Sequence, residues 1–390
     1  MSKLIITRLK GQILTALWDG NHMIQLQFDP DSRQPQVGDI YLGRVQNYLK
    51  NIQAAFIEIQ PDLIGYYSIP EGEKPPVPGD EILVQLTREA VKTKAAVLSA
   101  ELSLPGRYVV LVSGEKRVSV SNKITDRERR EWLKELLLPY CGDWGYIVRT
   151  NSGQVSDEEI ISEAGKLAAL YQELMQIGKH RICFSRLYAG DTAYLTAIRD
   201  IAAADLTDIV TDQEDLHASI QAFLNQYQPE DGGKLSLYAD PLLPLGKLYG
   251  LETVIEQALN RRVWLKSGGY LVIEPTETLT VIDVNTGKYN GRKKMEDTFF
   301  KINREAAQEI AAQLRLRNLS GIILVDFIDM AEEEHTNQLL AELEAAVNRD
   351  PVKTVLVDRT KLNLVELTRK KVRKPLYEQV YVKASDSVNR

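Results

Sequence analysis

The sequence predicts a multidomain α/β protein, α+β in its overall organisation, in which a small β-barrel precedes a strand–helix–strand unit. Its 390 residues are enough for two or three domains of ordinary size. Residues 37–103 contain closely spaced short strand patterns, and residues 260–385 alternate apolar strands with one long helical pattern. We therefore expect a barrel and an open sheet within one chain.

The first 36 residues are predicted to form a β-hairpin. Polar and apolar residues alternate in LIITRLKGQILTALWDGNHMIQLQF, which is typical of strands. Asp19-Gly20-Asn21 supplies turn residues between two such strands. The stretch from Pro30 to Gly38 is then expected to be a linker.

Residues 37–103 are predicted to form a closed barrel of the OB type. Their strand-like runs are short and separated by turn residues, as in DIYLGRVQNYL, AAFIEI, IGYYSI and EILVQLTRE. Such barrels bind single-stranded nucleic acids through surface aromatic and basic side chains. An aromatic residue in a strand belongs to the core more often than to a binding surface, so the pattern alone is weak. The candidates are Phe56, Tyr66, Arg88 and Lys94.

The composition excludes several classes of protein. No apolar run is long enough to cross a membrane, and the N-terminus turns polar too early for a signal peptide. We therefore expect a cytoplasmic protein without membrane contact. Cys141 and Cys183 have no Cys or His partner at zinc-ligand spacing, so neither a zinc site nor a disulfide framework is expected.

Positive charge is concentrated in the last third of the chain, although the formal net charge is −6. The net charge argues mildly against a nucleic-acid partner, whereas the clustering favours one. The alternative is that these groups are solvated helix faces. The groups are Arg261-Arg262 with Lys266, Arg292-Lys293-Lys294, Arg315 with Arg317, and Arg369-Lys370-Lys371 with Arg373-Lys374.

The middle of the chain mixes strand and helix patterns. Within residues 104–194, RYVVLV and WGYIVRT are typical of strands, while DRERREWLKELL and DEEIISEAGKLAALYQELMQ are typical of helices. The mixture continues in residues 195–259 with ADLTDIVTD and KLSLYAD. These patterns extend the α/β prediction but indicate no site.

Two aspartates interrupt the apolar strands of a predicted βαβ unit. Its strands are LTVIDVN and GIILVDFIDM, joined by a helix over EDTFFKINREAAQEIAAQLRLRN. A crossover makes the strands parallel, so Asp283 and Asp326 should lie at the same edge of the sheet. Strand alternation puts Asn285 on the face of Asp283. Because two carboxylates with waters and phosphate oxygens suit Mg²⁺, or Mn²⁺ in its place, the sequence predicts a site that activates water on a phosphate.

The alternative for these aspartates is structural. Asp283 could cap a turn over Thr286-Gly287, and Asp326 could pair with a nearby arginine. Asp329 is expected on the face opposite Asp326, as a capping or supporting residue. Asp358 is followed by basic residues and is expected to form a salt bridge.

Longer runs of the chain resemble the ribonuclease E/G family. RRVWLKSGGYLVI, IDVNTGKY, EDTFFKIN and LVELTRKKVR are similar to its catalytic region, and GDIYLGRV, QAAFIEI and GYIVRT to its OB-fold and 5′-end sensor. The resemblance implies hydrolysis of single-stranded RNA in rRNA processing or mRNA decay, leaving a 5′-phosphate and a 3′-hydroxyl. It also implies that Asp283 and Asp326 bind Mg²⁺ and that Asn285 assists.

The resemblance assigns further residues to substrate binding. It implies that Arg149 and Thr150 bind a 5′-monophosphate in a pocket lined by Val110, and an arginine fork with a hydroxyl suits a terminal phosphate. The family usually has a basic pair where this chain has Asn122-Lys123, so weaker sensing of the 5′ end is expected. The implied RNA contacts of the barrel are Phe56, Tyr66, Arg88 and Lys94.

The resemblance also implies a domain arrangement. An RNase H-like subdomain would combine residues 1–36 with 195–259, around an inserted OB-fold (37–103) and a 5′-sensor region (104–194). A DNase I-like catalytic subdomain would follow in residues 260–385. The usual Cys-Pro-x-Cys segment is replaced by YEQVYVKASDSVNR, so no zinc is expected and a homodimer would depend on other contacts.

Two other functions remain open at this point. One is a catalytically inactive RNA-binding or ribosome-assembly factor with the same fold. The other is a DNA nuclease, because paired carboxylates with Mg²⁺ serve both polymers.

Overall fold

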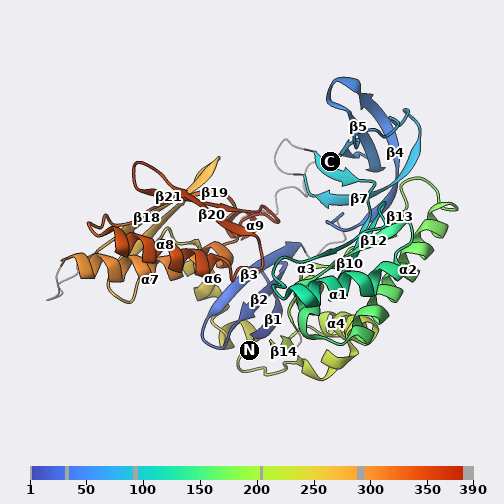
Figure 1. Ribbon diagram of the computed structural model, residues 1–390. Helices are drawn as coiled ribbons and strands as arrows, with labels where there is room; N and C mark the ends of the chain where they lie inside the picture. Colours follow the sequence, from blue (N-terminus) through green and yellow to red (C-terminus); the bar gives the residue numbers. More distant parts are fainter. Residues whose placement is uncertain (1, 31–34, 91–94, 203–204, 288–294, 381–390) are drawn as a thin grey trace. The chain divides into compact units, whose positions relative to one another are not determined.

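The chain forms two compact units, which we describe separately. The computed structural model describes residues 2–30, 35–90, 95–202, 205–287 and 295–380. One unit is Ser32–Ala202, and the other combines Met1–Asp31 with Ala203–Arg390 (Figure 1). The subdomain boundaries expected from the resemblance stay predictions.

The OB-type barrel predicted for residues 37–103 is present. Its five strands are hydrogen-bonded in the order β4-β5-β6-β8-β7, and β7 pairs again with β4, which closes the barrel. Tyr41, Ile57 and Val84 are fully buried inside it. The short strand β13 (Arg186–Tyr188) adds to the outer edge of β4. The barrel strands are β4 (Ile40–Leu49), β5 (Ala54–Gln60), β6 (Leu63–Ser68), β7 (Glu81–Arg88) and β8 (Ala96–Ser99).

The rest of this unit is a small sheet covered by helices. The sheet has the order β11-β12-β10-β9. Helix α1 is capped by Asp126, whose carboxylate accepts two backbone N–H groups, and α2 begins with a capping box between Ser156 and Glu159. The elements are β9 (Ser103–Pro105), β10 (Val109–Ser113), β11 (Val118–Val120), α1 (Arg127–Leu137), β12 (Trp144–Val148), α2 (Asp157–Gly178) and α3 (Ala193–Asp200).

The N-terminal segment contains three strands, so the two-strand prediction was wrong. β1 (Ser2–Leu9) and β2 (Gln12–Trp18) are joined at Lys10 and Gly11, which both have positive φ values, 54° and 75°. Two such residues form the tight turn that hairpins prefer, but lysine in the first position is not a usual turn signal. The predicted turn at Asp19 to Asn21 joins β2 to β3 (Met23–Pro30).

The N-terminal strands share a sheet with a distant part of the chain. β1 pairs in parallel with β14 (Leu206–Thr211), and β14 pairs in parallel with β15 (Leu235–Leu237), giving the order β15-β14-β1-β2-β3. The apolar sides of these strands pack with α6 in one core. The helices that follow β14 are α4 (Glu214–Tyr227), α5 (Leu245–Leu248) and α6 (Leu251–Leu259).

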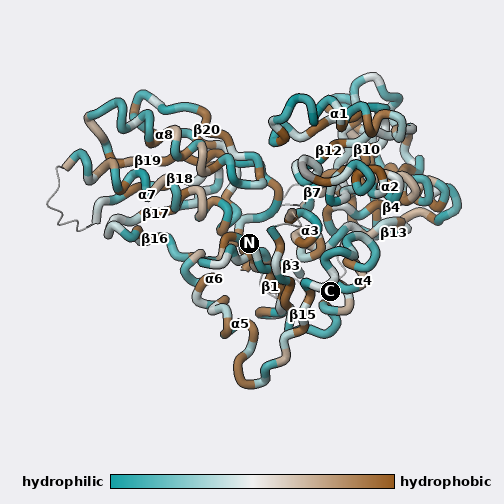
Figure 2. The backbone as a smooth tube through the Cα atoms, turned by 60° about the horizontal axis from the view of Figure 1, so that its bottom comes forward, coloured by the Kyte–Doolittle hydropathy of each residue, from teal (hydrophilic) through white to brown (hydrophobic). Residues whose placement is uncertain are grey.

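The predicted βαβ unit is part of a second, six-stranded sheet. Its order is β16-β17-β18-β19-β21-β20, and β18 and β19 are parallel because α7 crosses between them. Hydrophobic and hydrophilic positions alternate along α7 and α8 (Figure 2). The strands are β16 (Arg262–Trp264), β17 (Tyr270–Pro275), β18 (Leu279–Asn285), β19 (Gly321–Asp326), β20 (Thr354–Arg359) and β21 (Leu364–Arg369); the helices are α7 (Met295–Leu316), α8 (Glu333–Val347) and α9 (Leu376–Val380).

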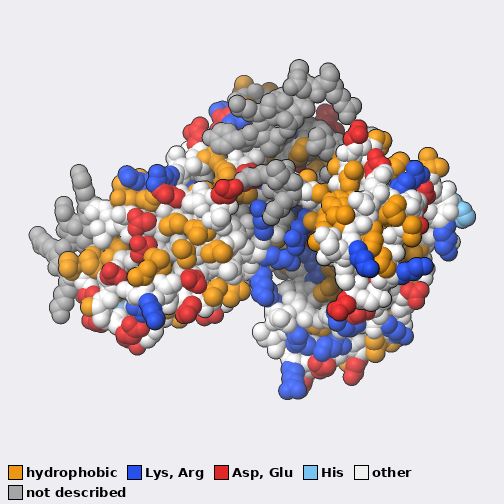
Figure 3. Space-filling view, turned by 90° about the horizontal axis from the view of Figure 1, so that it is seen from above, with side chains coloured by type: hydrophobic (Ala, Val, Ile, Leu, Met, Phe, Trp, Pro, Cys, Tyr) orange, Lys and Arg blue, Asp and Glu red, His pale blue; other side chains and the backbone are white. Residues whose placement is uncertain are grey.

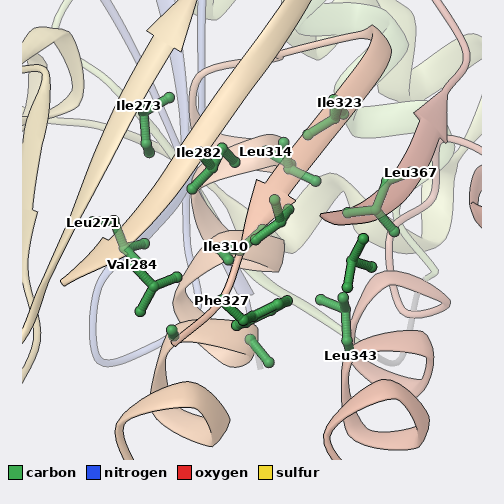
Figure 4. Packing of buried hydrophobic residues seen from close by; sticks show 14 of the residues in the cluster. Leu271, Ile273, Ile282, Val284, Ile310, Leu314, Ile323, Phe327, Leu343 and Leu367 are labelled. Carbon is green, nitrogen blue, oxygen red and sulfur yellow. The ribbon is translucent and has the colours of Figure 1, made fainter. Parts of the chain in front are cut away.

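The core of this sheet lies on one face, against α7 and α8. Leu271, Ile282 and Val284 from the strands meet Ile310 and other helix residues there (Figure 4). The alternate positions of the same strands therefore face the opposite side of the sheet.

None of the helices in the described ranges is long and apolar enough to cross a membrane.

Both cysteines are free thiols, with Cys141 buried and Cys183 half-buried.

Candidate functional site

Asp283 and Asp326 occupy paired positions on two parallel strands. The register of β18 and β19 places Asp283 opposite Asp326, and neighbouring strands lie about 4.8 Å apart. Both side chains are exposed, whereas Ile282 and Val325 beside them are fully buried. The two carboxylates therefore lie side by side on the face of the sheet that is turned away from the core.

Asn285 supports Asp283 from the same strand. Its Nδ2 donates a hydrogen bond of 2.6 Å to Oδ2 of Asp283. Residues two apart in a strand share a face, so this bond is a direct consequence of strand alternation. It fixes the orientation of one carboxylate and leaves the amide oxygen of Asn285 as a further oxygen donor.

The electrostatics of the pair favour a bound cation. Burial and then the charges of Asp283 and Asp329 raise the pKa of Asp326 above its ordinary value. In the described ranges no lysine or arginine forms an ion pair with Asp283 or Asp326, so the arginine pairing considered as an alternative for Asp326 is absent there. Closely spaced carboxylates repel each other, and a divalent ion relieves that repulsion.

The donor set fits a hard cation that keeps water ligands. The described part of the chain has no cluster of three or more His, Cys, Asp or Glu side chains that could hold a metal ion, so the protein would supply only a small number of ligands. Asp283 and Asp326 supply two carboxylates, and Asn285 supplies an amide. Oxygen ligands of this kind suit Mg²⁺ or Mn²⁺, which complete their shells with water and phosphate oxygens.

Asp329 lies outside the strand that carries Asp326. Because β19 ends at Asp326, the alternation that was expected to turn Asp329 to the opposite face does not extend to it. Its carboxylate accepts a 3.1 Å hydrogen bond from Nδ2 of Asn363, and its charge contributes to the raised pKa of Asp326. Asp329 therefore acts on the pair electrostatically.

The salt bridge predicted for Asp358 is not formed with any of the described residues, so the prediction was wrong there. Its carboxylate accepts a hydrogen bond of 2.8 Å from the backbone N–H of Arg359. The Arg359 side chain instead pairs with Glu333 on α8 at 3.0 Å. Glu333 comes from a helix distant in sequence from the strand, so residue spacing did not reveal this pair.

Some of the basic groups are structural and unavailable to a polyanion. Arg369 is 3% exposed and pairs with Asp350 at 2.8 Å. Arg317 is 6% exposed, and burial lowers its pKa to about 10. The prediction that these arginines form a nucleic-acid surface is therefore wrong for both. The group Arg292-Lys293-Lys294 lies outside the described residues.

Side chains of α7 that the sequence did not single out hold the loop after β19. Asn303 is fully buried and bonds both the N–H and the carbonyl of Ile328. Glu296 accepts hydrogen bonds from the N–H groups of Ala331 and Glu332 at 3.1 and 3.2 Å. The only signal in the sequence for this support is an asparagine within an amphipathic helix pattern. It can be recognised only once the buried face of the helix is known.

The residues expected to bind a 5′-phosphate lie close together in the other unit. Val110 on β10 pairs with Ile147 on β12, two residues before Arg149. Arg149 Nη1 donates to the carbonyl of Gly106 at 2.7 Å. The hydroxyl of Thr150 lies 3.0 Å from that of Ser121.

Arg149 is also tied to an acidic partner. Its Nη1 lies 2.8 Å from Oδ1 of Asp200, which Arg199 contacts at 2.9 Å. Burial acts to raise the pKa of Asp200, but the charges of Arg199 and Arg149 outweigh it, so the pKa is lowered. Both contacts of Arg149 use Nη1, which leaves Nε and Nη2 without a partner in the described ranges.

The barrel residues expected to bind RNA are brought together only in part. Phe56 and Tyr66 face each other in the β5–β6 register, and their rings lie 6.1 Å apart at 75°. Both are half-buried on the outside of the barrel, since their neighbours Ala55 and Tyr67 fill its core. Arg88 is exposed at the end of β7. Lys94 lies outside the described residues.

An OB-type barrel and a carboxylate pair on an open sheet face define a mixed α/β protein with a polar candidate site. The chain belongs to the ribonuclease E/G family, because a sequence model of the Ribonuclease E/G family matches residues 103–372 and named relatives align along most of its length. Ribonuclease G of Salmonella typhimurium is 35% identical over 393 residues, which covers 95% of this chain and 80% of that protein. Ribonuclease G of Escherichia coli (strain K12) is 35% identical over 396 residues, covering 96% and 81%. Ribonuclease E of Nostoc sp. is 34% identical over 382 residues, covering 92% of this chain and 56% of that protein.

Proposed function

We propose that the chain is an endoribonuclease that cleaves single-stranded RNA in RNA processing or decay with the help of Mg²⁺ or Mn²⁺. The relatives named ribonuclease G and ribonuclease E support the endoribonuclease activity. The metal is supported by the family, which consists of metal-dependent nucleases. The observation that carries the proposal is the pairing of Asp283 with Asp326, without a basic partner in the described residues.

Each residue of the pair would have a defined task. Asp283 and Asp326 would hold the ion, which when bound activates a water and neutralises charge on the phosphate. Asn285 keeps Asp283 in orientation through its 2.6 Å hydrogen bond. In the hydrolysis, the water oxygen forms a bond to phosphorus and the bond from phosphorus to the 3′ oxygen breaks. One proton of the water ends on that oxygen, which leaves a 3′-hydroxyl and a 5′-phosphate.

We propose further that Arg149 and Thr150 bind the 5′-monophosphate of the substrate beside Val110. Nε and Nη2 of Arg149, which have no partner among the described residues, and the exposed hydroxyl of Thr150 offer donors to phosphate oxygens. The ion pair with Asp200 holds the guanidinium in place. Its negative charge also opposes phosphate binding, so the preference for 5′-monophosphorylated RNA is expected to be smaller than an arginine without an acidic partner would give.

The barrel is proposed to hold the RNA chain. Phe56 and Tyr66 are half-exposed rings on its outer face, and the exposed Arg88 pairs with Val97, which pairs with Tyr66. Aromatic rings stack on bases and cations follow the phosphates, so this surface suits single-stranded RNA. Lys94 belongs to the same proposal.

A homodimer without shared zinc is proposed as well, to be tested by a mass measurement in solution together with a zinc assay.

A direct digest tests the proposed function. The purified protein would be incubated with matched single-stranded RNA and DNA oligonucleotides, in Mg²⁺ and then in EDTA. Metal-dependent internal cleavage of RNA alone is the expected result. RNA binding without products in either buffer would favour an inactive binding factor, and equal cleavage of both polymers would favour a general nuclease.

A further inference from the structure

An aromatic and basic cluster lies at one edge of the sheet that carries Asp283. Trp264 on edge strand β16 is 64% exposed, and its ring lies 5.2 Å from that of Tyr270 at an angle of 59°. The guanidinium of Arg262 lies 4.4 Å from the centre of the Tyr270 ring and 5.6 Å from that of Trp264. Arg262 is thus held in place by the two rings.

The strand register places this cluster on the same face as the carboxylates. Across the sheet, Asp326 pairs with Asp283, Asp283 with Val272, and Val272 with Arg262. Side chains of directly paired residues point to the same face, so Arg262 lies in one row with both aspartates.

A second row runs beside the first. Asn285 pairs with Tyr270, and Tyr270 pairs with Trp264. Since Asn285 bonds to Asp283, the two rows lie on one face. The alternate residues Leu271 and Ile273 point into the core on the other side (Figure 4). Trp264 is two strand spacings from Asn285, about 10 Å.

Exposure alone would not make this cluster a site. Hydrophobic side chains reach the surface among charged ones at many places on the face shown in Figure 3, as they do on most proteins. Two features distinguish the cluster. It shares its face with the carboxylate pair, and Arg262 has no carboxylate partner in the described ranges, whereas its neighbour Arg261 is paired with Glu274.

We propose that Trp264 stacks on a base of the single-stranded RNA substrate close to the scissile phosphate, while Arg262, held by Tyr270, contacts the adjoining phosphate. The proposal rests on the proposed ribonuclease function and adds a substrate-binding subsite to it. A flat exposed ring binds any base through its π-face, and an arginine held at a ring adds cationic attraction. The distance from Asn285 places the stacked base within about one or two nucleotides of the phosphate at the carboxylates.

The first test measures RNA binding in EDTA, where cleavage does not interfere. A short single-stranded RNA should bind Trp264→Ala about 5- to 150-fold more weakly than wild type. Trp264→Phe should retain most of the affinity because it keeps a stacking ring. Val357→Ala is the matched control, since Val357 is an exposed apolar residue on the opposite edge strand β20 and should bind RNA like wild type.

The second test locates the stacked base. A series of RNAs, each with one abasic nucleotide at a successive position relative to the cut, would be bound to wild type and to Trp264→Ala. At one position close to the cut, removal of the base should weaken wild type but have little further effect on the variant. Arg262→Ala should weaken binding of every RNA in the series and lower the salt slope by about one.

Three results would overturn the proposal. Unchanged affinity of Trp264→Ala would remove the stacking role, as would penalties that simply add at every abasic position. Unchanged RNA affinity together with loss of a dimer in a solution mass measurement would assign Trp264 to a contact between copies. These failures are distinct from failure of the proposed function, which is judged by whether wild type cleaves RNA at all.

Discussion

Asn303 on α7 holds Ile328 through both of its backbone groups. Nδ2 of Asn303 donates to the Ile328 carbonyl at 2.8 Å, and the Ile328 N–H donates to Oδ1 at 3.1 Å. Ile328 is two residues after Asp326, so these bonds fix the chain where it leaves the carboxylate pair. The helix that connects the two strands therefore also supports the end of the second one.

Asn303→Ala should weaken both the fold and the metal site. Two backbone groups lose their buried partners, which we expect to lower the free energy of unfolding by about 1–3 kcal/mol. Loss of this support should also lower the affinity for Mn²⁺, by about 10- to 100-fold. Urea unfolding and a Mn²⁺ titration would measure the two effects. Asn337→Ala, at an exposed position of α8, is the control, and equal behaviour of the two variants would contradict the account.

Arg149→Ala should reduce the preference for 5′-monophosphorylated RNA. A charged hydrogen bond contributes about 1.5–3 kcal/mol, so we expect cleavage of the 5′-monophosphate substrate to fall by about 10- to 150-fold. Cleavage of the same RNA with a 5′-hydroxyl should change little. The measurement is kcat/KM on the two substrates, with the exposed Arg127→Ala on α1 as control. Equal losses on both substrates would argue against 5′-end binding.

The ion pair between Arg8 and Asp215 should make stability depend on pH in the acid range. Arg8 contacts both carboxylate oxygens of Asp215, at 2.7 and 2.6 Å. Its hydrogen bonds hold the pKa of Asp215 at about 2, below the ordinary value of 3.8. A lowered pKa in the folded state stabilises the fold above pH 3.8, and this contribution is lost as the pH falls towards 2.

Urea unfolding of wild type and Asp215→Asn checks this expectation. The two free energies of unfolding should differ at pH 6 and converge between about pH 4 and pH 2. A difference that stays constant over this range would contradict the assignment.

Arg369 should be essential for stability and neutral for RNA binding. Its side chain and that of Asp350 are 2% and 6% exposed, and breaking a buried pair by removing one partner costs about 3–5 kcal/mol. Arg369→Met should therefore destabilise the fold strongly, as measured by urea unfolding. Arg304→Met, which breaks the more exposed pair with Glu342, should cost less than about 1 kcal/mol. Similar losses in the two variants would contradict this distinction.

The sequence predicted the secondary-structure elements better than the tertiary contacts of their side chains. The βαβ unit and the barrel followed from strand alternation and from one long amphipathic helix, because both patterns are local. The turn at Lys10 and Gly11 was missed, since lysine gives no turn signal. Arg369 looked like part of a basic surface, because its partner Asp350 reaches it only through tertiary packing.

The candidate site was predictable only where it depended on strand pattern. Asp283 and Asp326 could be paired because a crossover makes their strands parallel and brings their ends to one edge. The support from Asn303 depends on how α7 packs, and the row from Asn285 to Trp264 depends on the register of antiparallel strands. Neither relationship has a signature in the order of the residues.

Turnover of aspartate variants tests the central claim most directly. Asp283→Asn, Asp326→Asn and the control Asp358→Asn would be assayed on a single-stranded RNA in Mg²⁺, after RNA affinity has been measured in EDTA. Asp358 is an exposed aspartate in strand β20 of the same sheet. The first two variants should lose more than about 100-fold in turnover at unchanged affinity, because even residues outside a ligand set contribute about 10- to 100-fold. The control should cleave like wild type, and normal turnover of either Asp283→Asn or Asp326→Asn would contradict the paired-carboxylate site.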